Sequence, residues 1–351
     1  MARGPNYGPV IRAWLLDEVK EGRGSDLAAR AAQRFEITRQ AISRHIKRLT
    51  DERVLAPTGM TRSRSYQLAV LSSFGKSYKV GGLEEHDVWA QDVRPLLADV
   101  APNVVGICEY GFTEILNNAI DHSGAESVMV TVGRTAAQID MSVNDRGIGI
   151  FRKVREARGL ETDREAILEI TKGKITTDPS RHTGEGIFFT SRMMDSFVIL
   201  SGSLGLVHKR ASNDWLFEDP EDPKEGTLVS MKIDPMSDHS ANEVFERYGA
   251  TQEDYAFART HISLALAQAA GGSLVSRSQA KRVMVGLDRF RLVLLDFRGV
   301  QSIGPAFADE IFRVWKRAHA EVAIMPVDAG EEVKRMIARA EGADAPPDPL
   351  S

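Results

Sequence analysis

The sequence predicts a multidomain α+β protein, and three observations support this prediction. A chain of 351 residues is long enough for two or three domains. Residues 1–70 hold 13 Lys or Arg against 7 Asp or Glu, whereas the remainder holds 32 of the 45 basic and 42 of the 49 acidic residues. Helical and strand-like periodicities also alternate in separate blocks. We expect modules at 1–70, 91–236 and 237–340, a linker with a short helix at 71–90 and a disordered tail at 341–351.

The bulk composition excludes several classes of protein. Cys108 is the only cysteine, so one chain can form neither a disulfide framework nor a cysteine-based zinc site. The N-terminal residues lack the apolar core of a signal peptide, and no apolar run approaches the roughly 18 residues of a membrane span. We therefore expect a cytoplasmic protein with no membrane contact, whose basic first module meets a polyanion.

The N-terminal module is predicted to contain three helices followed by a β-hairpin. The first helix covers 9–21, and the second begins at a capping Ser25. Thr38 is the expected N-cap of the third helix. The buried stripe of that helix is expected to comprise Ala41, Ile42, Ile46 and Leu49. Two short strands within 54–70 enclose a basic, glycine-containing turn.

This order of elements, with TRQAISRHIKRLTDERVL at 38–55, resembles winged helix-turn-helix DNA-binding domains. The resemblance implies that the third helix enters the major groove of double-stranded DNA. It also implies that the wing contacts phosphates or the minor groove. The residues assigned to DNA are Arg39, Gln40, Ser43 and Arg44 on the helix, with Arg62 and Arg64 in the wing. A winged helix used for protein contacts is the alternative.

The central module is predicted to be α+β, with helices on one face of a mixed or antiparallel sheet. Helices are expected at 91–100 and 103–124, and strands with period-two alternation follow at 126–135 and 137–147. A long polar stretch covers 151–183. A glycine-rich turn then leads into a helix, and three further strands close the module, at 198–203, 204–210 and 226–233.

The helix at 103–124 has an unusual polar face. At 100° per residue, one arc carries Glu114, Asn117, Asn118, Asp121 and His122, and the opposite arc is apolar. A solvated face normally carries good helix formers, whereas Asn in mid-helix lowers helix propensity. These polar residues therefore predict a functional surface.

Three motifs in order resemble those of the GHKL-type ATP-binding domain (Bergerat fold) shared by gyrase, histidine kinases and MutL. They are ExxxNNAxxH at 114–122, NDRGIGI at 144–150 and TGEGIFF at 183–189. The resemblance covers about 90–235 and implies an α/β sandwich that binds ATP with Mg²⁺. It makes 151–183 the ATP lid.

The adenine and phosphate contacts follow from these motifs. Asp145, at a strand end, can accept hydrogen bonds from the adenine amino group, whereas the oxygen of guanine would be repelled. Gly147 and Gly149 permit a tight turn beside the base and sugar. The phosphates are expected beside Gly184, Gly186 and the helix that begins near Ile187, whose free N–H groups can bind them.

Other site residues come from the polar helix face and the lid. Asn118 is expected to complete a Mg²⁺ shell shared with phosphate oxygens. Glu114 is positioned to polarise a water or hydroxyl as the catalytic base. His122 and the Thr183 hydroxyl are further candidate ATP contacts. The basic lid residues that could close on the γ-phosphate are Lys172, Lys174, Arg181 and His182.

The C-terminal module is predicted to be a small α/β domain. A helix-like run at 259–269 precedes LVLLDFRGVQSIGPAFADEIFRVW at 292–315, which resembles STAS-type domains of anti-sigma-factor antagonists. Regulatory members carry a phosphorylatable Ser at the start of the helix after this strand. Here Gly304, Pro305 and Ala306 occupy that region, and the nearest hydroxyl, Ser302, lies earlier, which argues against a phosphoacceptor role.

Together these modules predict an ATP-binding regulator that binds DNA, in which Mg-ATP binding or hydrolysis controls the winged helix and STAS-like modules. An anti-sigma-type protein serine kinase and an ATPase-gated defence effector remain alternatives. A histidine kinase is disfavoured, because 27 residues between His86 and Glu114 are too few for its dimerisation hairpin and the first ATP-domain helix. A homodimer, and a protein partner for the STAS-like module, are also expected.

Overall fold

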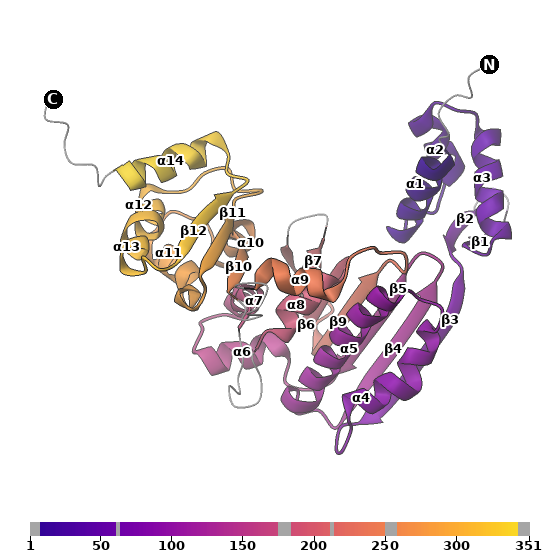
Figure 1. The fold of residues 1–351 in the computed structure, drawn as a ribbon, viewed down its shortest axis with the longest axis horizontal. Coiled ribbons are helices and arrows are strands. Elements are labelled where there is room, and N and C mark those ends of the chain that lie inside the picture. The colour runs from indigo at the N-terminus through magenta and orange to yellow at the C-terminus, as the bar shows by residue number, and fades with distance from the viewer. Residues whose placement is uncertain (1–7, 61–63, 175–183, 211–213, 250–257, 343–351) are drawn as a thin grey trace, which may run out of the picture.

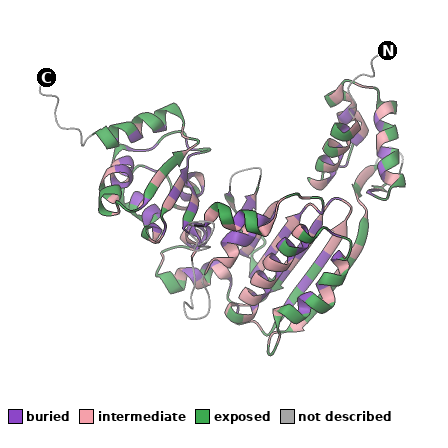
Figure 2. Ribbon diagram, viewed as in Figure 1, coloured by how far each residue is buried: buried purple, intermediate pink, exposed green. Residues whose placement is uncertain are grey.

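A computed structural model describes residues 8–60, 64–174, 184–210, 214–249 and 258–342 of the chain. Three bodies follow one another along the chain: a small helical module, a central twisted sheet and a C-terminal α/β layer (Figure 1). Buried residues concentrate where helices pack on each sheet, while the outer helix faces are exposed (Figure 2). The protein is therefore a mixed α+β molecule built from several modules.

The N-terminal module has the predicted order of elements. It contains α1 (Gly8–Lys20), α2 (Leu27–Phe35), α3 (Arg39–Asp51) and an antiparallel hairpin of β1 (Leu55–Thr58) and β2 (Ser65–Leu68). Thr38 caps α3 as predicted, because its hydroxyl oxygen accepts a hydrogen bond from the amide of Ala41 at 3.2 Å. The stripe of α3 packs into a core with α1, through Ile42, Ile46, Leu49, Ile11 and Leu15.

The start of α2 differs from the prediction. Asp26, not Ser25, is the N-cap residue, in a left-handed conformation with φ of 50° and no side-chain capping bond. The Ser25 hydroxyl instead bonds the Ser65 hydroxyl of β2 at 3.4 Å. The long-range contact with β2 thus replaces the local cap that the sequence suggested.

The segment predicted as a linker at 71–90 contains a strand of the central sheet. β3 (Val70–Lys79) pairs antiparallel with β4 (Ser127–Thr135), and only Ala69 separates β3 from β2. Phe74 and Tyr78 pack on the core while most other residues of β3 are exposed, as at a sheet edge. A polar edge strand carries a weak hydrophobic signal, which explains the wrong prediction.

The region before the long central helix is also less regular than predicted. A short helix, α4 (Glu85–Val88), is followed by a π-helical turn over Trp89–Val93 and a 3₁₀ turn over Arg94–Leu97. Pro95 has no amide hydrogen to donate, so a regular α-helix cannot continue through it. One helix at 91–100 was expected instead.

In the part of the chain that the structure describes, the central sheet has seven antiparallel strands in the order β3-β4-β5-β9-β6-β7-β8. α5 (Pro102–His122) and α8 (Gly186–Met193) pack on one face, and α9 (Ala241–Tyr248) packs against both helices (Figure 1). The remaining strands are β5 (Ile139–Asp145), β6 (Ser196–Gly202), β7 (Leu204–Lys209), β8 (Trp215–Glu218) and β9 (Lys224–Ile233).

Most of the described part of the predicted lid is helical. It forms α6 (Ile150–Arg158) and α7 (Asp163–Lys172), whose apolar residues are buried against the rest of the molecule. The basic candidates Arg181 and His182, and the candidate ATP contact Thr183, lie outside the described residues.

The C-terminal layer is a parallel sheet in the order β10-β11-β12, with β10 (Arg259–Ser263), β11 (Leu292–Asp296) and β12 (Ala323–Val327). The run predicted as helical from 259 begins with β10, because buried Thr260 and Ile262 alternate in a strand that pairs with β11. Its helices are α10 (Leu264–Gly271), α11 (Arg277–Met284), α12 (Pro305–Asp309), α13 (Lys316–Ala318) and α14 (Glu331–Gly342), with irregular turns over Leu287–Arg289 and Glu310–Trp315. Among the described residues, no helix has both the length and the apolar content needed to cross a bilayer.

Candidate functional site

A pocket opens where α5, β5, α6, α8 and β9 meet. Its empty space is about 850 Å³, counting the part open to solvent. Residues from all three sequence motifs line it together. The predicted ATP contacts that line it are Asn118, His122, Asp145, Gly149, Gly184 and Ile187.

Asp145 is a buried carboxyl group in this pocket, with 4% of its surface exposed. Burial raises the pKa of Asp145 above its usual value, although hydrogen bonds from backbone amides oppose the shift. One of these comes from the amide of Gly147, which donates to Oδ1 at 2.8 Å. A buried carboxylate is energetically unfavourable unless a ligand donates hydrogen bonds to it.

Gly147 allows the turn after β5 to lie directly on the end of α5. A Cβ atom at this position would overlap the backbone carbonyl of Ser123. The next residue, Ile148, donates its amide hydrogen to that same carbonyl at 3.0 Å. Gly147 is not among the described residues that line the pocket. It sets the position of the following loop residues, Ile148 and Gly149, which do line it.

Thr227 is a pocket residue that the motifs did not reveal. It lies on β9 directly opposite Asp145 in the strand register. Its hydroxyl oxygen accepts a hydrogen bond from the amide of Ile150 at 3.0 Å, which fixes the start of α6 after Gly149. The register of β5 with β9 joins residues 82 positions apart, so no local pattern could have predicted this contact.

Lys153 on α6 is a second unpredicted pocket residue. Its ammonium group donates to the backbone carbonyl of His122 at 2.6 Å, at the end of α5. Burial lowers the pKa of Lys153, and the charge of Asp121 opposes that shift. Helical periodicity of Ile150, Phe151 and Val154 is the signal that could have placed Lys153 on a helix beside the site.

Glu114, the predicted base, lies one turn from Asn118 on the half-buried face of α5. Its carboxylate packs against the first residue of α8, so a Cβ atom on Gly186 would overlap it. Glu114 is not among the described residues that line the pocket, whereas Asn118 is. The contact places a carboxylate at the amino end of α8, where free N–H groups favour negative charge.

Lys172 is not available to a ligand in the pocket, contrary to the prediction. Its side chain is fully buried, and its ammonium group donates to the backbone carbonyls of Arg282 at 3.0 Å and Val285 at 3.1 Å in the C-terminal layer. Lys174 likewise reaches the carbonyl of Arg289 at 3.5 Å. Both lysines therefore join the predicted lid to the last module.

The predicted DNA contacts lie in a different part of the molecule. Arg39, Gln40, Ser43 and Arg44 are exposed along α3, and Arg64 is exposed beside β2. Arg62 lies outside the described residues. The structure thus groups four of the six on one solvent-facing side of the helix that was predicted to read DNA.

Comparison with known families identifies part of the C-terminal layer. Residues 279–334, from α11 to the first turn of α14, match the family described as "STAS-like domain of unknown function (DUF4325)". This segment is a STAS-like domain. The STAS-like domain supplies β11, β12 and the helices between them. Gly304 is the N-cap residue of α12, at the position where the sequence lacks a phosphoacceptor Ser. No curated protein matches the chain.

Proposed function

We propose that the protein is an ATP-responsive regulator, with a GHKL-type ATP-binding domain between a DNA-binding winged helix and the STAS-like domain. The observation that carries the proposal is the buried carboxyl group of Asp145, together with Asn118 and the glycine turns around one pocket. Asp145 would accept the adenine amino hydrogens. The nucleotide would then donate a strong hydrogen bond to a carboxylate whose burial is otherwise unfavourable.

Asn118 and the start of α8 would hold the phosphate end of the ligand. Among the described residues, no cluster of three or more His, Cys, Asp or Glu side chains could bind a metal alone. Mg²⁺ would neutralise phosphate charge while taking Asn118 and phosphate oxygens as ligands. Glu114, one turn away, would orient a water or a partner hydroxyl.

Contacts between the lid and the STAS-like domain support coupling between these modules. The Arg289 guanidinium donates to the carbonyls of Lys174 at 2.8 Å and Gly173 at 3.0 Å, and Arg282 pairs with Glu165 at 2.7 Å. The atoms of the predicted lid in these contacts lie within 165–174, the last described stretch of the chain before Gly184. A ligand that moves this segment would change the contacts, which is how differential affinity would couple the sites.

Nucleotide binding is tested by titration calorimetry with ATP and Mg²⁺. Wild type should bind saturably, and Asp145→Asn should bind at least about tenfold more weakly because a charged acceptor is lost. Asp140→Asn is the matched control, since Asp140 lies on the same strand and pairs with Lys232 at 3.4 Å outside the pocket. Equal affinity in all three proteins would refute the nucleotide site.

DNA binding is tested by fluorescence anisotropy on duplex DNA over a range of salt concentrations. Removing Arg39 and Arg44 should weaken binding and lower its salt dependence, because phosphate contacts release counterions. Arg34→Ala, on the exposed side of α2, serves as the control. Binding that is identical with and without ATP would contradict the coupling, and no DNA binding would favour a protein-contact role for the winged helix.

The same protein with γ-labelled ATP and Mg²⁺ separates the alternatives. Label on a partner protein that disappears in Glu114→Gln would indicate an anti-sigma-type serine kinase. Free phosphate would indicate hydrolysis, as in an ATPase-gated defence effector, and retained ATP would indicate binding alone. The proposed homodimer is tested by light scattering on the eluting protein.

A further inference from the structure

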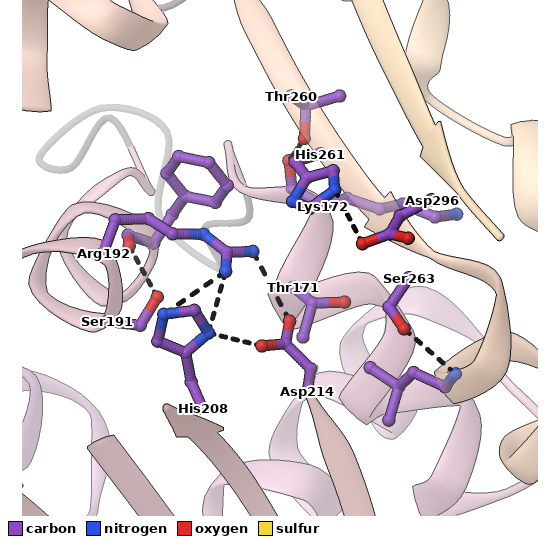
Figure 3. Close-up of polar contacts among 12 residues, drawn as sticks. Thr171, Lys172, Ser191, Arg192, His208, Asp214, Thr260, His261, Ser263 and Asp296 are labelled. Atoms are coloured by element: carbon purple, nitrogen blue, oxygen red, sulfur yellow. Dashed lines mark hydrogen bonds and ion pairs between the residues drawn. The ribbon is translucent and has the colours of Figure 1, made fainter. Parts of the chain in front are cut away.

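A second cavity lies at the junction between the central sheet and the C-terminal layer (Figure 3). Its empty space is about 590 Å³, counting the part open to solvent. Arg192 of α8, His208 of β7 and Asp214 line it from the central module, and His261 of β10 and Asp296 of β11 line it from the other. The cavity therefore exists only while the two modules meet in this way.

Positive charge exceeds negative charge in this junction cavity. The described lining residues include two carboxylates, Asp214 and Asp296, and four arginines: Arg192, Arg210, Arg247 and Arg298. Arg210 also pairs with Asp195 at 2.9 Å and Arg298 with Asp328 at 3.3 Å, so the excess of arginine over carboxylate is confined to the residues that line the cavity. A concave surface with this imbalance concentrates anions.

Arg192 has unused donor capacity inside the protein. Its side chain is only 8% exposed and lies over the ring of Phe188, with 5.2 Å between the guanidinium carbon and the ring centre. It contacts Asp214 at 3.4 Å and the Nδ1 atom of His208 at 2.8 Å. Its buried Nε has no hydrogen-bond partner in the described protein. An unsatisfied charged donor is costly, and Arg192 lines the cavity, so an oxygen-rich ligand there would add acceptors beside its guanidinium group.

The other side of the cavity is the carboxyl end of a parallel sheet. Ser263 ends β10 and Asp296 ends β11, and the two residues are partners in the strand register. Ligands of open α/β sheets bind outside the carboxyl ends of the strands. His261 Nε2 lies 3.1 Å from Asp296 Oδ2, and the Arg298 guanidinium bonds the same carboxylate at 2.6 Å. The buried carboxylate of Asp296 thus fixes the side chains of His261 and Arg298 in the wall of the cavity.

We propose that the junction cavity binds the phosphate group of a small organic phosphate, at a site separate from the nucleotide pocket. Arginine suits this ligand because its planar fork can bond two phosphate oxygens at once. Arg192 comes from one module and Arg298 from the other, so a bound phosphate bridges them. The ligand stabilises the contact between the central module and the STAS-like domain.

Titration calorimetry of the full chain tests this site, with glycerol 3-phosphate and inorganic phosphate as probes at constant ionic strength set with chloride. Wild type should bind glycerol 3-phosphate saturably, and Arg298→Gln and Arg247→Gln should each weaken it at least tenfold. Arg247 is exposed, so its replacement should leave the fold intact. Arg291→Gln is the matched control, because Arg291 is exposed at the amino end of the same β11 strand.

The titration is repeated in Asp145→Asn to distinguish binding in the junction cavity from binding in the nucleotide pocket. Phosphate binding that survives there supports the junction site even if ATP binding fails. Saturation by inorganic phosphate with the same affinity would identify free phosphate as the source of the recognised group. No saturable binding of either probe, or equal losses in Arg298→Gln and Arg291→Gln, overturns the proposal.

Discussion

Asp145 is a carboxyl group held among largely apolar pocket residues, and its titration should be visible in the free protein. Its folded-state pKa is raised by burial, so its contribution to stability is fully present below the unfolded value of about 3.9 and is lost as pH rises through the folded value. Asparagine does not titrate. The melting temperature of Asp145→Asn relative to wild type should therefore rise between pH 4 and pH 7. A pH-independent difference, measured by scanning fluorimetry without ligand, would contradict the assignment.

Gly147 gives a second prediction at the residue scale. Gly147→Ala should destabilise the protein by about 1–3 kcal/mol, because the new methyl group overlaps the Ser123 carbonyl and the loop must shift. Gly133→Ala is the control, since a Cβ atom there meets no atom within 4 Å. Urea unfolding of both variants measures the difference. Similar unfolding free energies for the two would show that the loop has room to move.

Among the elements, α7 carries most of the described contact between the predicted lid and the last module. Lys172 ends this helix, and its backbone carbonyl also accepts a hydrogen bond from the Thr260 hydroxyl of β10 at 2.7 Å. A buried ammonium group is unfavourable unless paired, and here Glu169 and two carbonyls surround it. The end of α7 is thus attached to the C-terminal layer by several bonds at once.

Lys172→Met should release that attachment. We expect a loss of about 3–5 kcal/mol, because the Glu169 charge and two carbonyls lose their partner. Hydrogen exchange should increase at the end of α7 and at the end of α11, while the hairpin β1–β2 stays protected. Lys334→Met, at an exposed pair with Glu331 on α14, should change little. Unchanged hydrogen exchange at the end of α7 would contradict this attachment.

Sequence patterns predicted elements best where residues interact locally. The amphipathic face of α5 and the Thr38 cap need only neighbours within one or two turns, and both are found as expected. β3 and β10 were missed because their partners lie far along the chain. The same reason hid Thr227, which meets Asp145 only through strand register, and the junction cavity, which needs two modules.

At the scale of the whole molecule, the junction contains a pH-sensitive histidine. Burial and then the charge of Arg192 lower the pKa of His208, which keeps its imidazole neutral near pH 7, while Asp214 beside it opposes the shift. The folded pKa lies below the unfolded value of about 6.5, so the stability that neutral His208 provides is lost as pH falls through this region.

Acidification from pH 7 to pH 5 should therefore loosen the junction, where His208 faces Arg192, Asp214 and His261. Limited proteolysis should cut between the central sheet and the STAS-like domain more readily at pH 5. His208→Gln should remove most of this pH dependence, whereas His319→Gln, at the distant end of α13, should not. Equal pH dependence in both variants would assign the effect to another group.

Only Ala69 separates β2 from β3, so the connection between the first module and the central sheet is short. Ion pairs of Lys20 with Asp234 at 2.7 Å and of Glu21 with Lys209 at 3.1 Å add two further attachments to the sheet. A module on a flexible tether would search its surroundings independently, whereas these contacts restrain the first module, and α3 with it, beside the sheet. Any twist of the β3–β4 edge of the sheet would therefore change the orientation of the exposed face of α3.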